Sequence, residues 1–143
     1  MKNAVIGALL LTAAVAAPAH AAFTISCKTQ IEKPAKDAAR PIQWRWDGSE
    51  VSTTYTTHEK EEKSNRYKPV HFVQRDSISG IVNTYYGFVT AVLSNGDRQS
   101  RTYHVFERDN QLLATETWNL VTPEGAVVSS HQNEYRNCTW KKS

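Results

Sequence analysis

Apolar and polar residues alternate along much of this chain with the period of two that is typical of β-strands. Ile42, Trp44 and Trp46 fall on one face of such a segment, with polar residues between them. Asp47-Gly48 follows, a dipeptide that is favoured in tight hairpin turns. Residues 50–57, which come next, are rich in threonine. Because threonine and aromatic residues favour strands, the sequence predicts a β-hairpin here.

The alternation resumes after a charged interruption and continues to the C-terminal end. Residues 58–66 lack apolar side chains, so we expect an exposed loop there. Pro69 indicates an edge position for a strand over residues 67–75, because proline cannot donate a hydrogen bond to a neighbouring strand. Turn sequences such as Ser94-Asn95-Gly96-Asp97 separate the further strands that we expect over residues 81–93, 98–107, 111–121 and 126–139.

Strands joined by short turns predict an all-β fold. We expect an antiparallel meander of about seven to eight strands, closed as a small barrel or folded as a two-sheet sandwich. Closure would hide the two unpaired edges of a long meander. No part of residues 22–143 shows a sustained helical period.

The N-terminal segment, residues 1–21, has the features of a secretory signal peptide. A basic residue, Lys2, precedes an uncharged apolar stretch that ends before Pro18, and Ala19-His20-Ala21 fits a cleavage site of small residues. A membrane-spanning helix needs about 20 apolar residues, and this stretch is too short. We expect cleavage after Ala21 and one exported domain over residues 22–143, located in the bacterial periplasm or outside the cell.

Cys27 and Cys138 lie near the two ends of this expected domain. An even number of cysteines in an exported protein predicts a disulfide bond. The bond would bring the first and last strands together. A metal or redox site is an alternative, but neither cysteine has a second cysteine or a histidine close by in the sequence. A bond between two molecules is the other alternative.

Charge and motifs exclude several classes of function. Without Lys2, the 17 Lys and Arg residues fall to 16 against 14 Asp and Glu, which leaves a formal charge of +2. There is no basic cluster that would predict nucleic-acid binding. The sequence contains no hydrolase, metalloprotease, phosphate-binding or dinucleotide-binding motif. We expect no cofactor and no metal, although neighbouring strands could bring His104 and His131 together, and an enzymatic function is unsupported.

One strand places a charged residue among apolar ones. Glu116 shares the even face of residues 111–121 with apolar side chains that include Trp118. The corresponding faces of the two neighbouring predicted strands carry four more polar or aromatic residues: Arg101, Tyr103, His131 and Tyr135. Since an unpaired buried charge is costly, two interpretations are open. Glu116 reaches water or pairs with Arg101, or these six residues form the polar floor of a ligand pocket.

Aromatic residues suggest a second kind of interaction. Tyr85-Tyr86 must place one ring on each face of its strand, and Trp46 lies beside a turn. Exposed aromatic residues on a rigid sheet are frequent binding anchors. We therefore consider Trp46, Tyr85 and Tyr86 as candidate surface anchors for a protein partner.

The layout of a signal peptide, a β-meander and a cysteine near each end resembles small periplasmic barrel proteins, among them lysozyme inhibitors and lipocalin-like binders. The sequence has neither the Gly-x-Trp motif of lipocalins nor a Ser-Gly-x-x-Tyr inhibitor loop, so no residue role is transferred. The sequence predicts an exported, non-enzymatic binding or interaction protein of the bacterial envelope. The alternative is a lipocalin-like binder of a small molecule. The partner, a protein or a small molecule, is not identified.

Overall fold

The computed structural model describes residues 22–32, 36–76 and 82–142, and every regular element within them is a β-strand. The all-β prediction is confirmed for these residues. The expected signal peptide, residues 1–21, lies outside them and stays a prediction. Within the described ranges we find no helix with the length and apolar character needed to cross a bilayer.

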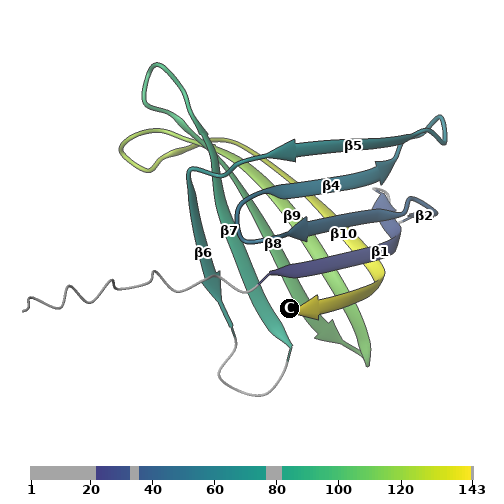
Figure 1. The fold of residues 1–143 in the computed structure, drawn as a ribbon. Coiled ribbons are helices and arrows are strands. Elements are labelled where there is room, and N and C mark those ends of the chain that lie inside the picture. Colours follow the sequence, from purple (N-terminus) through teal and green to yellow (C-terminus); the bar gives the residue numbers. More distant parts are fainter. Residues whose placement is uncertain (1–21, 33–35, 77–81, 143) are drawn as a thin grey trace, which may run out of the picture.

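The strands are arranged in one antiparallel sheet (Figure 1). In chain order they are β1 (Phe23–Glu32), β2 (Lys36–Ala38), β3 (Ile42–Trp46), β4 (Val51–Thr56), β5 (Glu62–Tyr67), β6 (His71–Arg75), β7 (Asn83–Val92), β8 (Arg98–Arg108), β9 (Gln111–Val121) and β10 (Val127–Lys142). The strand ranges predicted from the sequence pattern do not include β1, β2 or β5. β5 lies in the segment that we expected to be a loop, because its backbone pairs with β4 while most of its side chains remain exposed.

The order of the strands is β5-β4-β3-β1-β10-β9-β8-β7-β6, with the short β2 beside β1. The first and last strands, β1 and β10, therefore pair as predicted, and they join two meanders in the middle of the sheet. The expected closure is wrong. β5 and β6 are the two edges and do not pair, so the sheet is neither a closed barrel nor a sandwich of two separate sheets. Residues 67–75 do not form the single strand that we predicted. Tyr67 ends β5, Pro69 lies in the connection, and His71–Arg75 form the edge strand β6.

The predicted disulfide links β1 to β10. Cys27 and Cys138 face each other directly in the register of the two strands, and their sulfur atoms are bonded. Next to this bond both strands reverse the face that they bury. Cys27 points inward. Gln30, three residues further along β1, is paired with Tyr135, which also points inward. In a regular strand, residues three apart face opposite sides. Asn137 has a φ of 54° at this point. Such a local irregularity bends a strand, and β10 curves sharply here (Figure 1).

The curvature brings the two halves of the sheet face to face, and an aromatic core fills the space between them. The ring of Trp46 on β3 lies 5.1 Å from that of Phe72 on β6 and 5.3 Å from that of Phe88 on β7, measured between centroids. Trp44 packs against Tyr103 of β8 in the same way, at 5.1 Å. These strands are not neighbours in the sheet, so the contacts hold the fold in its curled form. Stacked or tilted aromatic pairs contribute about 0.5–1.5 kcal/mol beyond the burial of their area.

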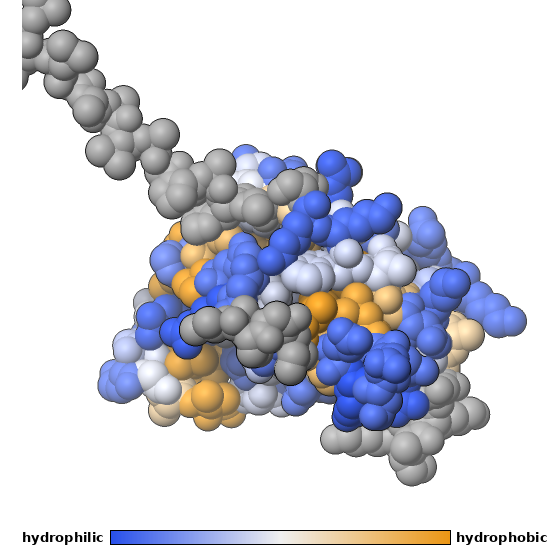
Figure 2. Space-filling model, turned by 90° about the horizontal axis from the view of Figure 1, so that it is seen from below, coloured by the Kyte–Doolittle hydropathy of each residue, from blue (hydrophilic) through white to orange (hydrophobic). Residues whose placement is uncertain are grey.

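Glycine and asparagine occupy the hairpin turns where positive φ angles are needed. Asp109 and Asn110 have φ angles of 53° and 59° in the turn between β8 and β9. Gly96 and Gly125 have φ angles of 87° and 92° in the turns that follow β7 and β9. The turns predicted from the sequence at these positions are confirmed. Hydrophilic residues cover much of the face seen in Figure 2, where apolar residues reach the surface in separate patches.

Candidate functional site

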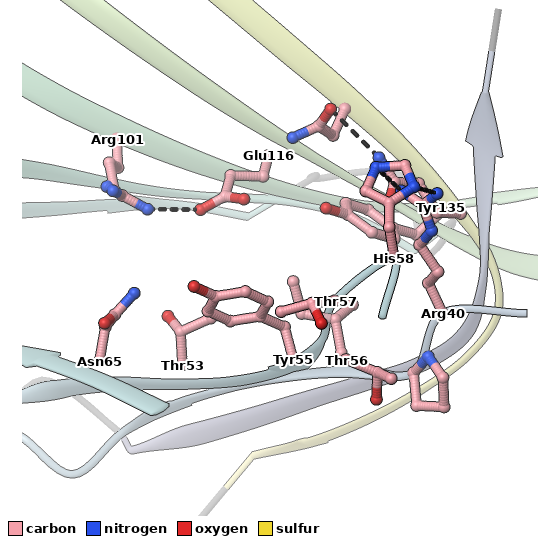
Figure 3. A pocket seen from close by; sticks show the side chains of 14 residues that line it. Arg40, Thr53, Tyr55, Thr56, Thr57, His58, Asn65, Arg101, Glu116 and Tyr135 are labelled. Atoms are coloured by element: carbon pink, nitrogen blue, oxygen red, sulfur yellow. Dashed lines mark hydrogen bonds and ion pairs between the residues drawn. The ribbon is translucent and has the colours of Figure 1, made fainter. Parts of the chain in front are cut away.

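A cleft of about 380 Å³ lies between the two halves of the sheet, beside the aromatic core. One wall comes from β4 and β5 and the other from β8, β9 and β10 (Figure 3). Neighbouring residues of a strand face opposite sides, so every second side chain of these strands points into the cleft. The lining residues include Gln30, Arg40, Thr53, Tyr55, His58, Asn65, Arg101, Glu116, Asn133 and Tyr135.

The wall formed by β8, β9 and β10 carries a charge pair. Arg101 of β8 donates a hydrogen bond from Nη1 to Oε1 of Glu116 on β9, with 2.9 Å between the two atoms. The two residues are diagonal neighbours, since Glu116 is directly opposite Tyr103 in the register. The Glu116 side chain is 11% exposed and that of Arg101 is 34% exposed. The pairing of Arg101 with Glu116, one of the two interpretations drawn from the sequence, is confirmed.

Two tyrosine hydroxyl groups lie beside the Arg101–Glu116 pair. The hydroxyl oxygens of Tyr67 and Tyr103 are 2.8 Å apart and form a hydrogen bond, and Tyr103 lies directly opposite Glu116 in the register of β8 and β9. Burial raises the pKa of Glu116, and the neighbouring Arg101 guanidinium opposes this effect. Burial also raises the pKa of Tyr67 to about 12, so its hydroxyl keeps its proton at neutral pH. The Arg101–Glu116 pair therefore lies next to a hydrogen-bonded tyrosine pair that extends into the core.

The opposite wall carries a buried hydroxyl group without a partner. Thr53 of β4 is 5% exposed, and its Oγ1 makes no hydrogen bond. Its neighbour in the register is Asn65 of β5. Both side chains lie across the cleft from Arg101 and Glu116 (Figure 3). A buried polar atom without a partner costs about 1–3 kcal/mol, and a bound molecule that reaches Thr53 would relieve this cost.

The far end of the cleft is also polar. The guanidinium of Arg40, just before β3, contacts the imidazole ring of His58, which follows β4. Because a guanidinium group only donates and a neutral imidazole has one acceptor nitrogen, only one of the two ring nitrogens can accept from Arg40. Gln30 donates from Nε2 to Oδ1 of Asn133, at 3.4 Å. Tyr135 lies beside this pair, and burial raises the pKa of its hydroxyl.

The structure brings most of the six predicted pocket residues together. Arg101, Glu116 and Tyr135 line the cleft. Trp118 and His131 line an adjoining hollow of about 410 Å³ that shares Arg101, Glu116 and Asn133 with it. Tyr103 is fully buried, bonds Tyr67, and does not line the cleft.

Sequence reasoning missed the opposite wall. Thr53 lies two residues from both Val51 and Tyr55, so all three share one face of the strand, and the position of Thr53 on the inner face could have been predicted from the pattern. Asn65 could not, because it lies in the segment that we expected to be a loop. Nothing in the sequence indicates that Arg40 and His58 meet, since their contact depends on how two loops are placed.

The predicted surface anchors need two corrections. Trp46 and Tyr86 are buried in the aromatic core, so neither is available to a partner. Tyr85 is 41% exposed and stacks on His104 on the outer face, with 3.9 Å between the ring centroids. His104 therefore lies on the face opposite His131, and the two histidines are not brought together.

Cofactor sites and relatives add no further assignment. Among the described residues, no group of three or more His, Cys, Asp or Glu side chains is placed to hold a metal ion. Comparison of the chain with family models, with curated proteins and with solved structures found no match. The function is therefore argued from the geometry of the cleft alone.

Proposed function

We propose that this chain is an exported binding protein that holds a small polar molecule in the cleft between the two halves of its sheet. The observation that carries the proposal is the buried Arg101–Glu116 pair, which faces the unpartnered hydroxyl of Thr53. Small-molecule sites typically combine a concave shape with a few convergent polar groups. The volume of about 380 Å³ lies near the lower end of their usual range.

The composition of the cleft favours binding over catalysis. Glu116 is the only carboxylate among the described residues that line it, and Arg101 already bonds that carboxylate. General acid–base chemistry on sugars usually needs two carboxylates. Export is supported by the disulfide, because such bonds persist in oxidising compartments. The bacterial periplasm remains our expectation from residues 1–21.

Native mass spectrometry of the protein purified from its own compartment tests the proposal. We expect a retained small molecule whose mass is lost when the protein is unfolded. A ligand should also raise the melting temperature by mass action. Retention of no molecule, together with no change of melting temperature in a broad screen of polar metabolites, would remove the support for the cleft as a binding site.

Substitutions at Glu116 provide the second test. Glu116→Gln keeps the shape of the side chain but removes its charge, whereas Glu116→Leu also removes its hydrogen bonds. Both should change the ligand response, because each alters the charge and the hydrogen bond that hold Arg101 in place. Glu61→Gln is the matched control, because Glu61 forms an exposed ion pair with Lys63 outside the cleft. The proposal is wrong if both Glu116 variants respond to ligand and unfold as the wild type does.

A second candidate function is binding of a protein partner on the outer face of β7 and β8. The rings of Tyr85, His104 and Phe106 form a stacked series there, with 4.7 Å between the centroids of His104 and Phe106. Exposed aromatic groups on a sheet are suited to such contacts. Cross-linking at position 85 in cells tests this function, and the absence of any cross-linked partner would count against it.

A further inference from the structure

The unused hydrogen-bonding groups of the cleft define the chemistry of its ligand. Among the described residues, Glu116 is the hydrogen-bond partner of the Arg101 guanidinium, and the bond uses Nη1. A guanidinium group has five N–H donors. The side chain is 34% exposed toward the cleft and the adjoining hollow. Arg101 therefore has donors that can bind a ligand while its bond to Glu116 is kept.

Two acceptor atoms of the same wall already have a donor. Oε1 of Glu116 accepts from Arg101, and Oδ1 of Asn133 accepts from Gln30. A ligand that binds the remaining N–H donors of Arg101 must supply acceptor atoms of its own.

The charge of the cleft favours the same kind of ligand. Its lining contains two guanidinium groups, Arg40 and Arg101, and one carboxylate, Glu116. The guanidinium of Arg101, whose side chain is 34% exposed, is a positive group that an anion can reach from the cleft. Arginine pairs with carboxylates through two parallel hydrogen bonds, which fix both the position and the orientation of the bound group.

The opposite wall, formed by β4 and β5, is suited to a different group of the ligand. Thr53 has a buried hydroxyl without a partner, and Asn65 beside it carries an amide that both donates and accepts. A hydroxyl group of the ligand satisfies both residues because it too can donate and accept. The cleft therefore presents an anion-binding group on one wall and a hydroxyl-binding group on the other.

We propose that the ligand is a small hydroxylated carboxylate, such as a sugar acid or a hydroxy acid. Its carboxylate binds the free side of Arg101, and a hydroxyl group binds Thr53 and Asn65 across the cleft. This inference rests on the proposed function, since it names the class of molecule that the same cleft takes.

Matched pairs of compounds test the charge requirement. We suggest D-glucuronate against D-glucose, D-gluconate against D-sorbitol, and D-glycerate against glycerol, since each pair exchanges a carboxylate for a CH₂OH group. Isothermal titration and the fluorescence of Trp118 report binding, with Trp118→Phe to identify its signal. We expect the acid of at least one pair to bind at least tenfold more tightly than its neutral partner, with an affinity that falls as salt is added.

Variants of the two walls test the assignment of groups. Arg101→Gln should weaken binding of the acid at least tenfold, and Arg101→Lys, which keeps the charge opposite Glu116, should weaken it less and provides a folded variant if Arg101→Gln is unstable. Thr53→Val should weaken binding of the acid several-fold, whereas Thr53→Ser should retain it. Arg66→Gln is the control, because Arg66 follows Asn65 on β5 and lies outside the cleft.

These experiments distinguish a failure of the ligand-class inference from a failure of the proposed function. If neutral compounds bind as tightly as their acids, or if native mass spectrometry retains a ligand without a carboxylate, this inference is wrong while the proposed function stands. If Thr53→Val binds the acid as the wild type does, the hydroxyl assignment is wrong. If no compound binds and no ligand is retained, both the inference and the proposed function are wrong.

Discussion

Glu116 lies among apolar neighbours on the inner face of β9, and its environment explains how a carboxylate is accommodated there. Arg101 supplies an opposite charge, with 2.9 Å between Nη1 and Oε1. A partly buried ion pair of this kind contributes little net stability, because desolvation offsets most of the attraction. Its presence at the wall of a cleft is therefore better explained by binding than by folding.

The pH dependence of stability tests the environment of Glu116. Burial raises its pKa above the ordinary value of 4.5 in the folded protein. The folded state then keeps its proton to higher pH than the unfolded state, so the contribution of Glu116 to stability falls as pH rises from 4.5 through the raised pKa. Urea unfolding across this interval should show that decline in the wild type relative to Glu116→Gln.

Subtraction of the two titrations removes contributions from other groups. Asp47, whose pKa is lowered by the backbone N–H groups of Glu50 and Ser49, gives the opposite trend in both proteins. It therefore cancels in the difference. A difference that is constant with pH, or that grows in favour of the wild type as pH rises, would contradict a raised pKa at Glu116.

At the scale of single elements, two hairpin turns meet at one end of the sheet. A Cβ atom on Gly96 would lie 2.9 Å from Cγ of Pro123, whereas one on Gly125 would have nothing within 4 Å. Both glycines have positive φ angles, which cost other residues about 1–2 kcal/mol. Gly125→Ala should therefore lose about that amount, and Gly96→Ala should lose more, as measured by chemical unfolding.

The excess loss at Gly96 has its own control. In a Pro123→Ala background the steric contact is removed, so Gly96→Ala should then cost no more than Gly125→Ala. If Gly96→Ala and Gly125→Ala lower the free energy of unfolding equally in the wild-type background, there is no steric contact between a side chain at position 96 and Pro123.

The pairing of β1 with β10 is the second feature at this scale, and the disulfide stabilises it. Cys27 and Cys138 are 111 residues apart, and a crosslink that closes so long a loop contributes up to about 4–5 kcal/mol in the chain-entropy description. Reduction should lower the free energy of unfolding by several kcal/mol, as measured by urea titration with and without dithiothreitol.

A double variant separates the bond from effects of the reductant. The chain has two cysteines, so Cys27→Ser combined with Cys138→Ser should unfold at the midpoint of the reduced wild type and should not respond to dithiothreitol. An oxidised protein that is no more stable than the reduced one would contradict a stabilising role of the bond.

At the scale of the whole molecule, the fold depends on contacts between strands that are not neighbours in the sheet. Tyr67, at the end of the edge strand β5, bonds Tyr103 of β8 across the space between the two halves. Tyr67→Phe should lower the free energy of unfolding by about 1 kcal/mol, the usual net contribution of one hydrogen bond. It should also weaken ligand binding, because the bond holds Tyr103, which lies directly opposite Glu116 in the register of β8 and β9.

Tyr85→Phe is the matched control, since its ring lies exposed on the outer face and borders neither hollow beside Glu116. It should change neither stability nor binding measurably. If Tyr67→Phe behaves in the same way as Tyr85→Phe, the bond between the two halves does not contribute to the curled form.

The amino-acid sequence by itself determined the local structure of this protein. Alternation of apolar and polar residues identified most of the strands, since the side chains of a strand point to opposite faces in turn. Glycine and asparagine marked the turns because they accept positive φ angles. The cysteine pair indicated which strands meet, and the same alternation placed Glu116 on an inner face beside Arg101.

Only the tertiary structure decided how the sheet curls and which faces it covers. The alternation of apolar and polar residues defines two faces of a strand but does not determine which face is buried. The pattern therefore does not show that Trp46 and Tyr86 lie in the core. β10 changes the face that it buries beside Asn137, and β5 and β6 remain apart, so the sheet does not close into a barrel. The curl of the sheet places Thr53 opposite Arg101, and the candidate site exists only because residues far apart in the chain meet across the fold.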